Sequence, residues 1–446
     1  MKNPMKHIKI PQTPMGLGLR MLNQFSGSQL ANQFGLREYA EKLMYHGMKT
    51  VVKTGTIAQS QFQSLKKILP KQELSHAAPA NVFDLTLTDE QQMICETIHE
   101  FADQQIKKVA RQADEERTVP EGFFKQCQDV GLNLLAIPEA LDGAGTSRSP
   151  VTSVLMAEEL AKGDMSLALA ALAPLGVINA LNEFGSLNQQ SHYLPNFAGE
   201  EFVAAAIALM EPKARFNPDR LETKAVKTPQ GYVITGEKCM VPLGAQCKLL
   251  LVVANLSGEG PKAFLVETHA EGISFQEERH MGLHATGMSR VKMNNVTVAL
   301  DALLGEQEKT YDHQKLLDLC HIGLCALAVG TCQAVLDYTI DYANAREAFG
   351  EPISHRQAVA FMIADIATEL EAMRMMTYRA ASRAEQGLDF HREAYLARIF
   401  CADKAMEIGT NGVQLLGGHG FVCEHPVELW YRQLRAIGIL EGGYLV

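Results

Sequence analysis

The sequence predicts an α+β protein made of three successive parts: an all-helical domain, a small antiparallel β-domain and a C-terminal helical bundle. Three observations support this fold class. A helical hydrophobic period runs from about residue 88 to 184, short β-rich runs separated by turn residues follow to about residue 304, and the helical period then returns. We therefore expect domains at residues 83–200, 201–305 and 306–446, preceded by a basic N-terminal extension and linker at 1–82.

The first helix of the folded region has a clear start signal. Thr88 and Gln91 have the spacing of a capping box, and apolar residues follow at helical intervals, which predicts a helix of about twenty residues. Gly131 and Gly163 are placed as helix stops. Further helices are expected at Glu121–Val130, Val151–Lys162, Ser166–Phe184, Gln314–Asn344, Arg356–Glu385 and Arg392–Leu416. Long helices joined by short loops favour a bundle of antiparallel neighbours.

The middle region has the pattern of a compact antiparallel sheet. Its turn signals include Pro229-Gln230-Gly231 and Ser257-Gly258-Glu259-Gly260. The expected strands are Phe202–Leu209, Tyr232–Thr235, Leu249–Val253, Ala263–Val266 and Val296–Val298.

Composition excludes several classes of protein. The chain has 446 residues, of which 47% are hydrophobic and 21% charged, enough to bury a large core. We find neither an uninterrupted apolar run of about eighteen residues nor a secretory start, so we expect neither a bilayer-spanning segment nor export. The nine cysteines never form a Cys-x-x-Cys pair, which predicts reduced thiols, a cytoplasmic location and no metal site.

Charge is distributed unevenly along the chain. Residues 1–80 carry a net charge of +8, whereas the rest carries −18. Such a basic leader could bind an anionic membrane as a peripheral contact, a polyphosphate, or the acidic body of the protein itself, and Leu36–Met48 has roughly helical apolar spacing. A disordered tail is a further alternative. Nucleic acid is disfavoured, because no recognition motif accompanies the charge.

A series of short motifs points to one family. In chain order they are Leu87-Thr88-Asp89-Glu90-Gln91, Ile137-Pro138-Glu139, Glu211-Pro212, Gly236-Glu237-Lys238, Met281-Gly282-Leu283, Arg346-Glu347-Ala348-Phe349-Gly350, Gln357-Ala358, Gln414-Leu415-Leu416-Gly417-Gly418-His419-Gly420-Phe421, His425-Pro426-Val427-Glu428 and Leu440-Glu441-Gly442. From about Phe83 to the end, the chain resembles the acyl-CoA dehydrogenases.

The resemblance implies an activity and a catalytic base. Members of that family use FAD to oxidise a fatty acyl-CoA to the trans-2-enoyl-CoA and pass electrons to an electron-transferring flavoprotein, usually as homo-oligomers. By resemblance, Glu441 is the base that removes the proton next to the thioester carbonyl. Its own backbone N–H and a flavin ribityl hydroxyl would hold the carbonyl oxygen. Without the resemblance, Glu441 would be a solvated carboxylate near a chain end.

The resemblance also assigns cofactor-binding residues. Arg346 would pair with the FAD pyrophosphate, with Phe349 and Gln357 completing that contact. The turn at Gly417 and Gly418, in the motif that begins at Gln414, would lie against the FAD of a neighbouring subunit. The alternatives are a surface charge for Arg346, a core position for Phe349 and a helix C-cap for the glycines.

The motifs depart from the family where the flavin ring would lie. Met210 stands where a Ser or Thr is usual, Pro242 replaces a Thr and cannot donate a backbone hydrogen bond, and His321, after Asp318 on the substrate side, replaces an Arg. Gly443 also replaces a Thr, and the sequence ends about one helix earlier than is usual. These departures leave a second hypothesis open, a catalytically impaired paralogue that binds acyl-CoA or FAD as a partner protein. An oxidase or acyl-carrier-protein dehydrogenase is a third.

Overall fold

The computed structural model describes residues 86–145, 148–305 and 309–446. The chain divides into two compact units, Met1–Val82 and Phe83–Val446, and the second unit contains every described residue. The hypotheses for the basic leader therefore lie outside the described residues. The domain boundaries drawn at residues 82, 200 and 305 remain predictions.

The first helix begins where the sequence predicts, and it is longer than expected. The Thr88 hydroxyl accepts the N–H of Gln91, and the Gln91 side chain accepts the N–H of Thr88, so the capping box is present. Helix α4 (Asp89–Phe101) continues through a π-helical segment (Ala102–Ile106) into α5 (Lys107–Glu116). A Cβ at Gly163 would lie 2.8 Å from Ile106. Gly163 is therefore needed for close packing against the π segment.

The remaining helices of the first part pack around one very apolar helix. They are α6 (Phe123–Asp129), α7 (Pro150–Gly163), α8 (Met165–Phe184), α9 (Leu187–Tyr193) and α10 (Pro195–Ala198). Both α8 and the later helix α11 (His313–Ala345) are long and apolar enough to cross a membrane by length and composition alone. Within their most apolar windows, however, 94% and 83% of the residues are buried inside the protein, as in core helices of a soluble fold.

The middle part is a seven-stranded sheet whose strand directions are mixed. Its strands are β1 (Ala205–Ala208), β2 (Lys224–Thr228), β3 (Gly231–Val241), β4 (Leu249–Leu256), β5 (Gly260–Glu267), β6 (Ile273–Glu277) and β7 (Ser289–Val298). Four strand pairs are antiparallel, but β4 pairs in parallel with both β1 and β2. The expectation of a purely antiparallel sheet was wrong in this detail, because a hydrophobic pattern identifies strands but carries no information about the direction of non-adjacent partners.

The sequence also missed β2 and β6. Both are edge-like in composition, with mostly exposed or half-buried side chains, so they lack the apolar run that identified the other strands.

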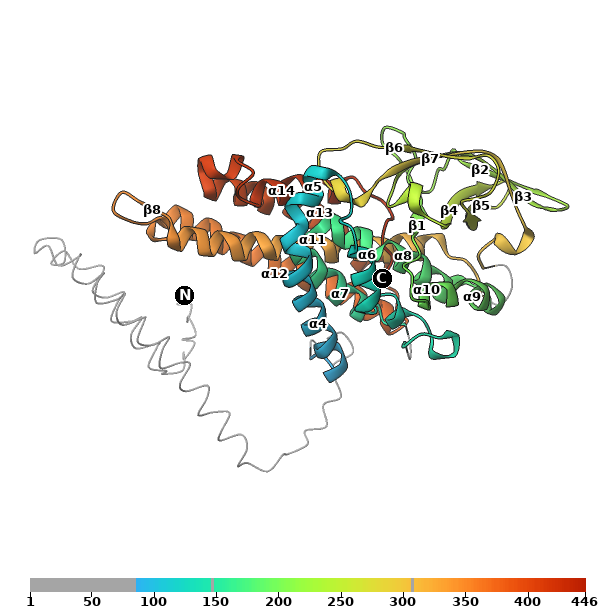
Figure 1. Ribbon diagram of the computed structural model, residues 1–446, viewed down its shortest axis with the longest axis horizontal. Coiled ribbons are helices and arrows are strands. Elements are labelled where there is room, and N and C mark those ends of the chain that lie inside the picture. The colour runs from blue at the N-terminus through green and yellow to red at the C-terminus, as the bar shows by residue number, and fades with distance from the viewer. Residues whose placement is uncertain (1–85, 146–147, 306–308) are drawn as a thin grey trace, which may run out of the picture. The chain divides into compact units, whose positions relative to one another are not determined.

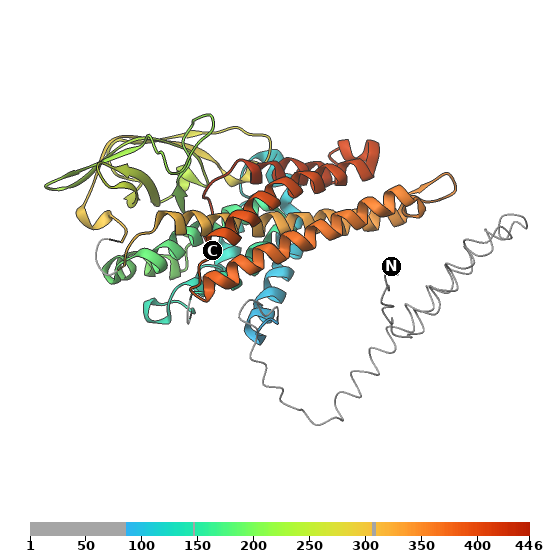
Figure 2. The same ribbon diagram turned by 180° about the vertical axis from the view of Figure 1, so that it is seen from behind.

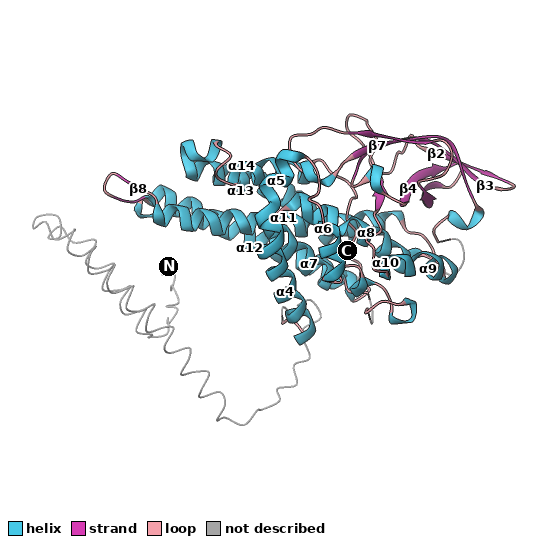
Figure 3. Cartoon of the chain, in the orientation of Figure 1, coloured by secondary structure: helices cyan, strands magenta, loops and turns pink. Residues whose placement is uncertain are grey.

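The last part is the predicted helical bundle. Helices α11, α12 (Gln357–Glu385) and α13 (His391–Leu416) begin and end within about one residue of the predicted positions, followed by the unpredicted α14 (Val427–Leu434). A short hairpin of β8 (Glu347–Ala348) and β9 (Glu351–Pro352) joins α11 to α12. Figures 1 and 2 show the long helices side by side, with the sheet at one end and the β8 hairpin at the other. Figure 3 shows the strands of the seven-stranded sheet gathered at one end of the long helices.

Short 3₁₀ turns complete the described chain. They are Leu134–Ala136, Glu139–Leu141, Gly244–Gln246, His284–Thr286, Leu300–Ala302, Ile353–His355, Gly417–Phe421 and Arg435–Gly438.

Candidate active site

Glu441 lies beside His321 near the N-terminal end of α11. Glu441 follows the Arg435–Gly438 turn, and its Oε2 is 2.6 Å from Nε2 of His321. The two side chains are mostly buried, with exposed fractions of 24% and 13% respectively. The structure therefore brings together two of the residues that the sequence assigned to one site.

Arg398 holds the turn that carries Glu441. From α13, its guanidinium donates to the backbone carbonyls of Ile437 and Leu440, and Nη2 lies 3.8 Å from Oε1 of Glu441. The sequence analysis missed Arg398. A signal was present, because Arg398 lies in the buried stripe of α13 with Ala394 and Cys401, where an arginine needs internal partners.

His321 and Arg398 decide the ionisation of Glu441. Burial raises the pKa of the Glu441 carboxyl, but the hydrogen bond and charge of His321, with a smaller contribution from Arg398, outweigh burial and leave this pKa below its usual value. Glu441 is therefore an ionised carboxylate at neutral pH, and it can accept a proton.

Asp318 lies one turn before His321 on α11, but its hydrogen bonds lead elsewhere. Its carboxylate is 3.0 Å from Nδ1 of His391 and accepts the amide of Gln314 at 3.0 Å. Burial is the largest influence on Asp318 and raises its pKa, while the hydrogen bonds from His391 and Gln314 oppose it. Asp318 therefore helps to set the electrostatic surroundings of His321 and is not bonded to Glu441.

The Met210 sulfur accepts the backbone N–H of Glu441, the proposed base. The Glu441 N–H points at Sδ of Met210, at the end of β1, with an N···S distance of 3.2 Å. A thioether is a weak acceptor, and Met210 is only 8% exposed. The N–H that the resemblance assigns to the thioester carbonyl is thus engaged within the chain. Pro242 lies on the same side, since a Cβ at Gly443 would be 3.9 Å from its ring.

The residues after Gly443 anchor this segment in the core. Tyr444, Leu445 and Val446 are fully buried. The Tyr444 hydroxyl donates to the carbonyl of Ser153, and the Asn179 amide donates to the carbonyl of Leu445. Gly323 on α11 makes room for the tyrosine, because a Cβ there would lie 2.7 Å from its ring. Glu441 is therefore held on both sides by buried contacts.

The other predicted site residues form a separate, exposed group that we call the far end. Arg346 and Phe349 follow α11, Gln357 begins α12, and Gln414, Gly417 and Gly418 lie where α13 ends. The two parts of the group are connected, since the Tyr342 hydroxyl is 2.8 Å from Nδ1 of His419. Phe349 is 95% exposed, so the core alternative for Phe349 was wrong.

The far end offers an open backbone surface. Gly417 has φ of +58°, and a Cβ at Gly417 or Gly418 would meet no atom within 4 Å in this chain. The chain's own packing therefore does not explain Gly418. An exposed arginine beside open glycine backbone suits the pyrophosphate of a dinucleotide. The residues present thus fit the phosphate end of FAD.

The far end and Glu441 are too far apart to share a cofactor within one chain. His321 and Arg346 are 25 residues apart on and just after α11. At about 1.5 Å per residue this is a separation of roughly 38 Å, longer than an extended dinucleotide. The structure therefore groups Glu441, His321, Met210, Pro242 and Asp318 at one end of the bundle and the other predicted residues at the far end.

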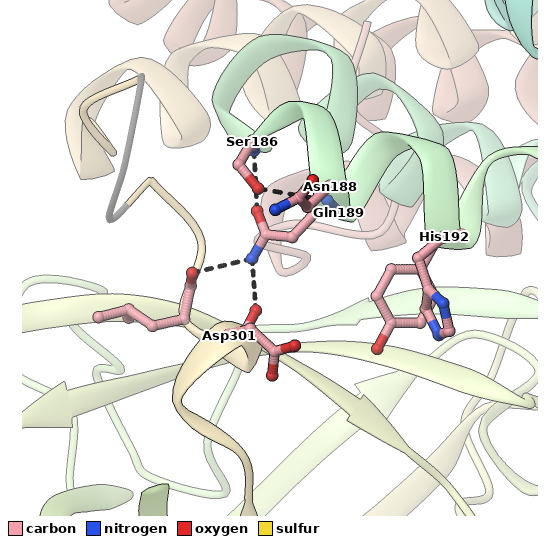
Figure 4. Close-up of a pocket in the computed structure, with 7 residues that line it drawn as sticks. Ser186, Asn188, Gln189, His192 and Asp301 are labelled. Carbon is pink, nitrogen blue, oxygen red and sulfur yellow. Dashed lines mark hydrogen bonds between the residues drawn. The ribbon is translucent and has the colours of Figure 1, made fainter.

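A cavity of about 280 Å³ lies away from both groups, next to α9. Its lining includes Ser186, Gln189, His192 and Asp301, and Figure 4 shows the Gln189 amide donating to two backbone carbonyls, those of Asp301 and Leu303, at 2.7 and 2.9 Å. The Gln189 amide, the central polar group of the cavity, thus links α9 to the segment that follows the sheet. Over the described ranges, we find no cluster of three or more potential metal ligands.

Comparison with known proteins agrees with the motifs. Three family models match: the acyl-CoA dehydrogenase N-terminal domain at residues 88–201, the middle domain at 206–296 and the C-terminal domain at 312–443. The short/branched chain specific acyl-CoA dehydrogenase of Rattus norvegicus mitochondria is 33% identical over 368 residues, covering 80% of this chain and 83% of the relative.

Solved structures show the same fold. Butyryl-CoA dehydrogenase from Megasphaera elsdenii superposes with a TM-score of 0.74 at 28% identity, covering 80% of this chain and 95% of the other. A structure reported as the electron transferring flavoprotein of Acidaminococcus fermentans gives 0.74 at 29% identity, with the same coverage. The chain belongs to the acyl-CoA dehydrogenase family, whose members are FAD-dependent oxidoreductases that act on CH–CH bonds.

Proposed function

We propose that this protein oxidises a fatty acyl-CoA to the trans-2-enoyl-CoA with Glu441 as the base. The observation that carries the proposal is the environment of Glu441: a mostly buried carboxylate with a lowered pKa, held by His321 from α11 and by Arg398 from α13. A buried ionised carboxylate with one face toward a substrate is suited to removing a weakly acidic proton.

Glu441 and Arg398 have different roles in the proposed reaction. Glu441 accepts the proton of the carbon next to the thioester carbonyl, and the electrons of that C–H bond form the new double bond as a hydride leaves the neighbouring carbon. FAD, when bound, supplies the acceptor of that hydride. Displacement of water by the acyl chain raises the basicity of Glu441, because desolvation disfavours a carboxylate. Arg398 keeps the turn, and so the carboxylate, in place.

We infer that a second copy of the chain completes each FAD site. Within one chain the far end lies roughly 38 Å from the level of His321, and its glycine backbone is open. In a homo-oligomer, the far end of one copy would bind the phosphate end of the FAD whose ring lies beside Glu441 of the other. An electron-transferring flavoprotein is the electron acceptor that we propose.

One observation favours a second candidate, the catalytically impaired paralogue. Met210 engages the backbone N–H of Glu441 at 3.2 Å, and Pro242 supplies no backbone donor. With the Glu441 N–H engaged, the enolate oxygen would lose one of its two donors, and the flavin ring would lose a backbone donor at Pro242, so acyl-CoA could bind without being oxidised.

The purified protein loaded with FAD separates the two candidates. For the first we expect acyl-CoA to bleach the flavin absorbance under anaerobic conditions, and Glu441→Gln to slow bleaching by about 10²–10⁴-fold while flavin content stays the same. Glu115→Gln, an exposed carboxylate on α5, is the matched control. Acyl-CoA binding to wild type without bleaching would favour the paralogue, and unchanged bleaching in Glu441→Gln would remove Glu441 from its role.

The location of the protein is also a proposal. We propose a cytoplasmic protein whose basic residues 1–80, with a net charge of +8, give peripheral contact with anionic membranes. The full chain would then sediment with anionic liposomes at low salt, and a version starting at Phe83 would not. If neither sediments, the leader is not a membrane contact.

A further inference from the structure

We propose that His321 is the positioning residue of the base, and that its protonation state sets the basicity of Glu441. The proposal rests on the proposed role of Glu441. It goes beyond that role, because it makes the base responsive to pH through the neighbouring histidine.

The geometry fixes the direction of the hydrogen bond. An ionised carboxylate only accepts, so Nε2 of His321 carries the proton and donates to Oε2 of Glu441 at 2.6 Å. Arg398 lies 3.8 Å from the other oxygen, Oε1. The carboxylate is thus flanked by a cationic or proton-donating group at each oxygen, which fixes its orientation.

The second ring nitrogen of His321 has no competing hydrogen bond. Nδ1 is buried and lacks a partner among the described residues. The ring can therefore exist as the neutral imidazole with Nδ1 bare, or as the imidazolium with both nitrogens protonated, without breaking its bond to Glu441. His321 can therefore gain or lose the proton on Nδ1 without changing its position.

Charged and titratable groups near the pair lie on α11 and α13. From α11 these are Asp318, one turn away, and the Cys320 thiol, whose pKa is raised by burial and by the Glu441 charge. From α13 these are Arg398, whose charge is fixed, and His391, bound to Asp318. The influence of His321 lowers the pKa of Asp318, which places the two groups within electrostatic reach of each other.

Histidine makes this site different from one that has arginine at the same position. Arginine stays charged at every accessible pH, whereas histidine changes charge near neutral pH. While His321 is an imidazolium, it stabilises the Glu441 carboxylate and weakens it as a base. When His321 loses its proton as pH rises, that attraction is lost and Glu441 takes up a substrate proton more readily.

The first experiment measures the rate of anaerobic flavin bleaching by acyl-CoA against pH in the holoenzyme. In wild type we expect the rate to rise through a histidine titration. His321→Arg should abolish that rise and stay at the low-pH rate. His321→Gln should keep the wild-type rate of high pH. Its rate should fall on the acid side at a higher pH than the ionisation of Glu441 in wild type, because the pKa of Glu441 rises when its cationic partner is removed. Parallel profiles for wild type and His321→Arg would overturn the proposal.

A second measurement is independent of activity. The ring signal of His321, assigned by its loss in His321→Gln, is titrated by NMR in wild type and in Glu441→Gln, with the exposed His269 as an internal control. We expect the titration midpoint of His321 alone to move to lower pH when Glu441 is neutralised. An unchanged midpoint contradicts the pairing. A shifted midpoint together with normal bleaching in Glu441→Gln would retain the pair but overturn its effect on catalysis and the proposed function.

Discussion

The two ends of α11 differ in how completely a single chain builds them. At the Glu441 end, Glu441 is bonded to His321, Arg398 is bonded to two backbone carbonyls, and Tyr444, Leu445 and Val446 are fully buried. At the far end, Arg346 and Phe349 are exposed, and a Cβ at Gly417 or Gly418 would meet no atom of the chain within 4 Å. Under the proposed function, the fold of one chain positions the base, whereas the site for the FAD phosphates is completed by a second copy.

This difference has a thermodynamic consequence. A residue that is satisfied within the chain stabilises the folded state whether or not a ligand is present. A residue whose partner is a ligand adds stability only when that ligand binds. Variants at the two ends should therefore respond differently to FAD.

The largest effect is expected for Arg398→Met. The change removes the donors to the carbonyls of Ile437 and Leu440, which stay buried, so the free energy of unfolding should fall by about 3 kcal/mol. The loss should be equal with and without FAD, as measured by chemical denaturation. Arg392→Met, an exposed arginine on the same helix, should cost little. A loss seen only with FAD would place Arg398 in the cofactor site.

A smaller and conditional effect is expected for Arg346→Ala. Loss of a charge-assisted contact to phosphate should weaken FAD binding by about 10–100-fold, measured by the flavin retained after gel filtration. The apoprotein should melt at the wild-type temperature. Arg220→Ala, an exposed arginine in the loop before β2, serves as the control. Equal flavin retention would return Arg346 to the role of a surface charge.

The smallest effect is expected for Met210→Leu. Leucine keeps the buried volume but removes the sulfur that accepts the Glu441 N–H, which frees that donor for the thioester carbonyl. We expect bleaching to accelerate roughly fivefold, equivalent to about 1 kcal/mol of transition-state stabilisation. The same substitution at Met288, buried elsewhere, should change nothing. An unchanged or slower rate would mean that Met210 does not compete with substrate.

The longer helices were predictable from the sequence because their signals are local, whereas the short helices α9, α10 and α14 were missed. The capping box at Thr88 and the long periodic segments fixed the helix positions to within a few residues, and the three bundle helices to within about one. Strand direction was not predictable, since the parallel pairing of β1 with β4 joins segments separated by the β2–β3 hairpin.

The candidate site was predictable only in part. The motifs named Glu441 and His321 separately, but their 2.6 Å contact depends on how a terminal turn packs against α11. Arg398 belongs to no motif, and its role follows from carbonyls about forty residues later in the chain. Met210 was recognised as a departure, yet its contact with the Glu441 N–H required the structure.

The most direct test of the two-ended account mixes two variants in one oligomer, at an FAD concentration that fills the wild-type site but leaves the Arg346→Ala site largely empty. Glu441→Gln keeps an intact far end, and Arg346→Ala keeps an intact base. If each site takes its base from one copy and its phosphate contacts from another, random pairing should restore roughly a quarter of the wild-type sites. Co-expressed chains with two different tags isolate the hybrid, in which roughly half of the sites should be intact. Bleaching by the hybrid well above that of either variant alone is the predicted result. A hybrid no more active than the variants would contradict the account and place the complete site within one chain.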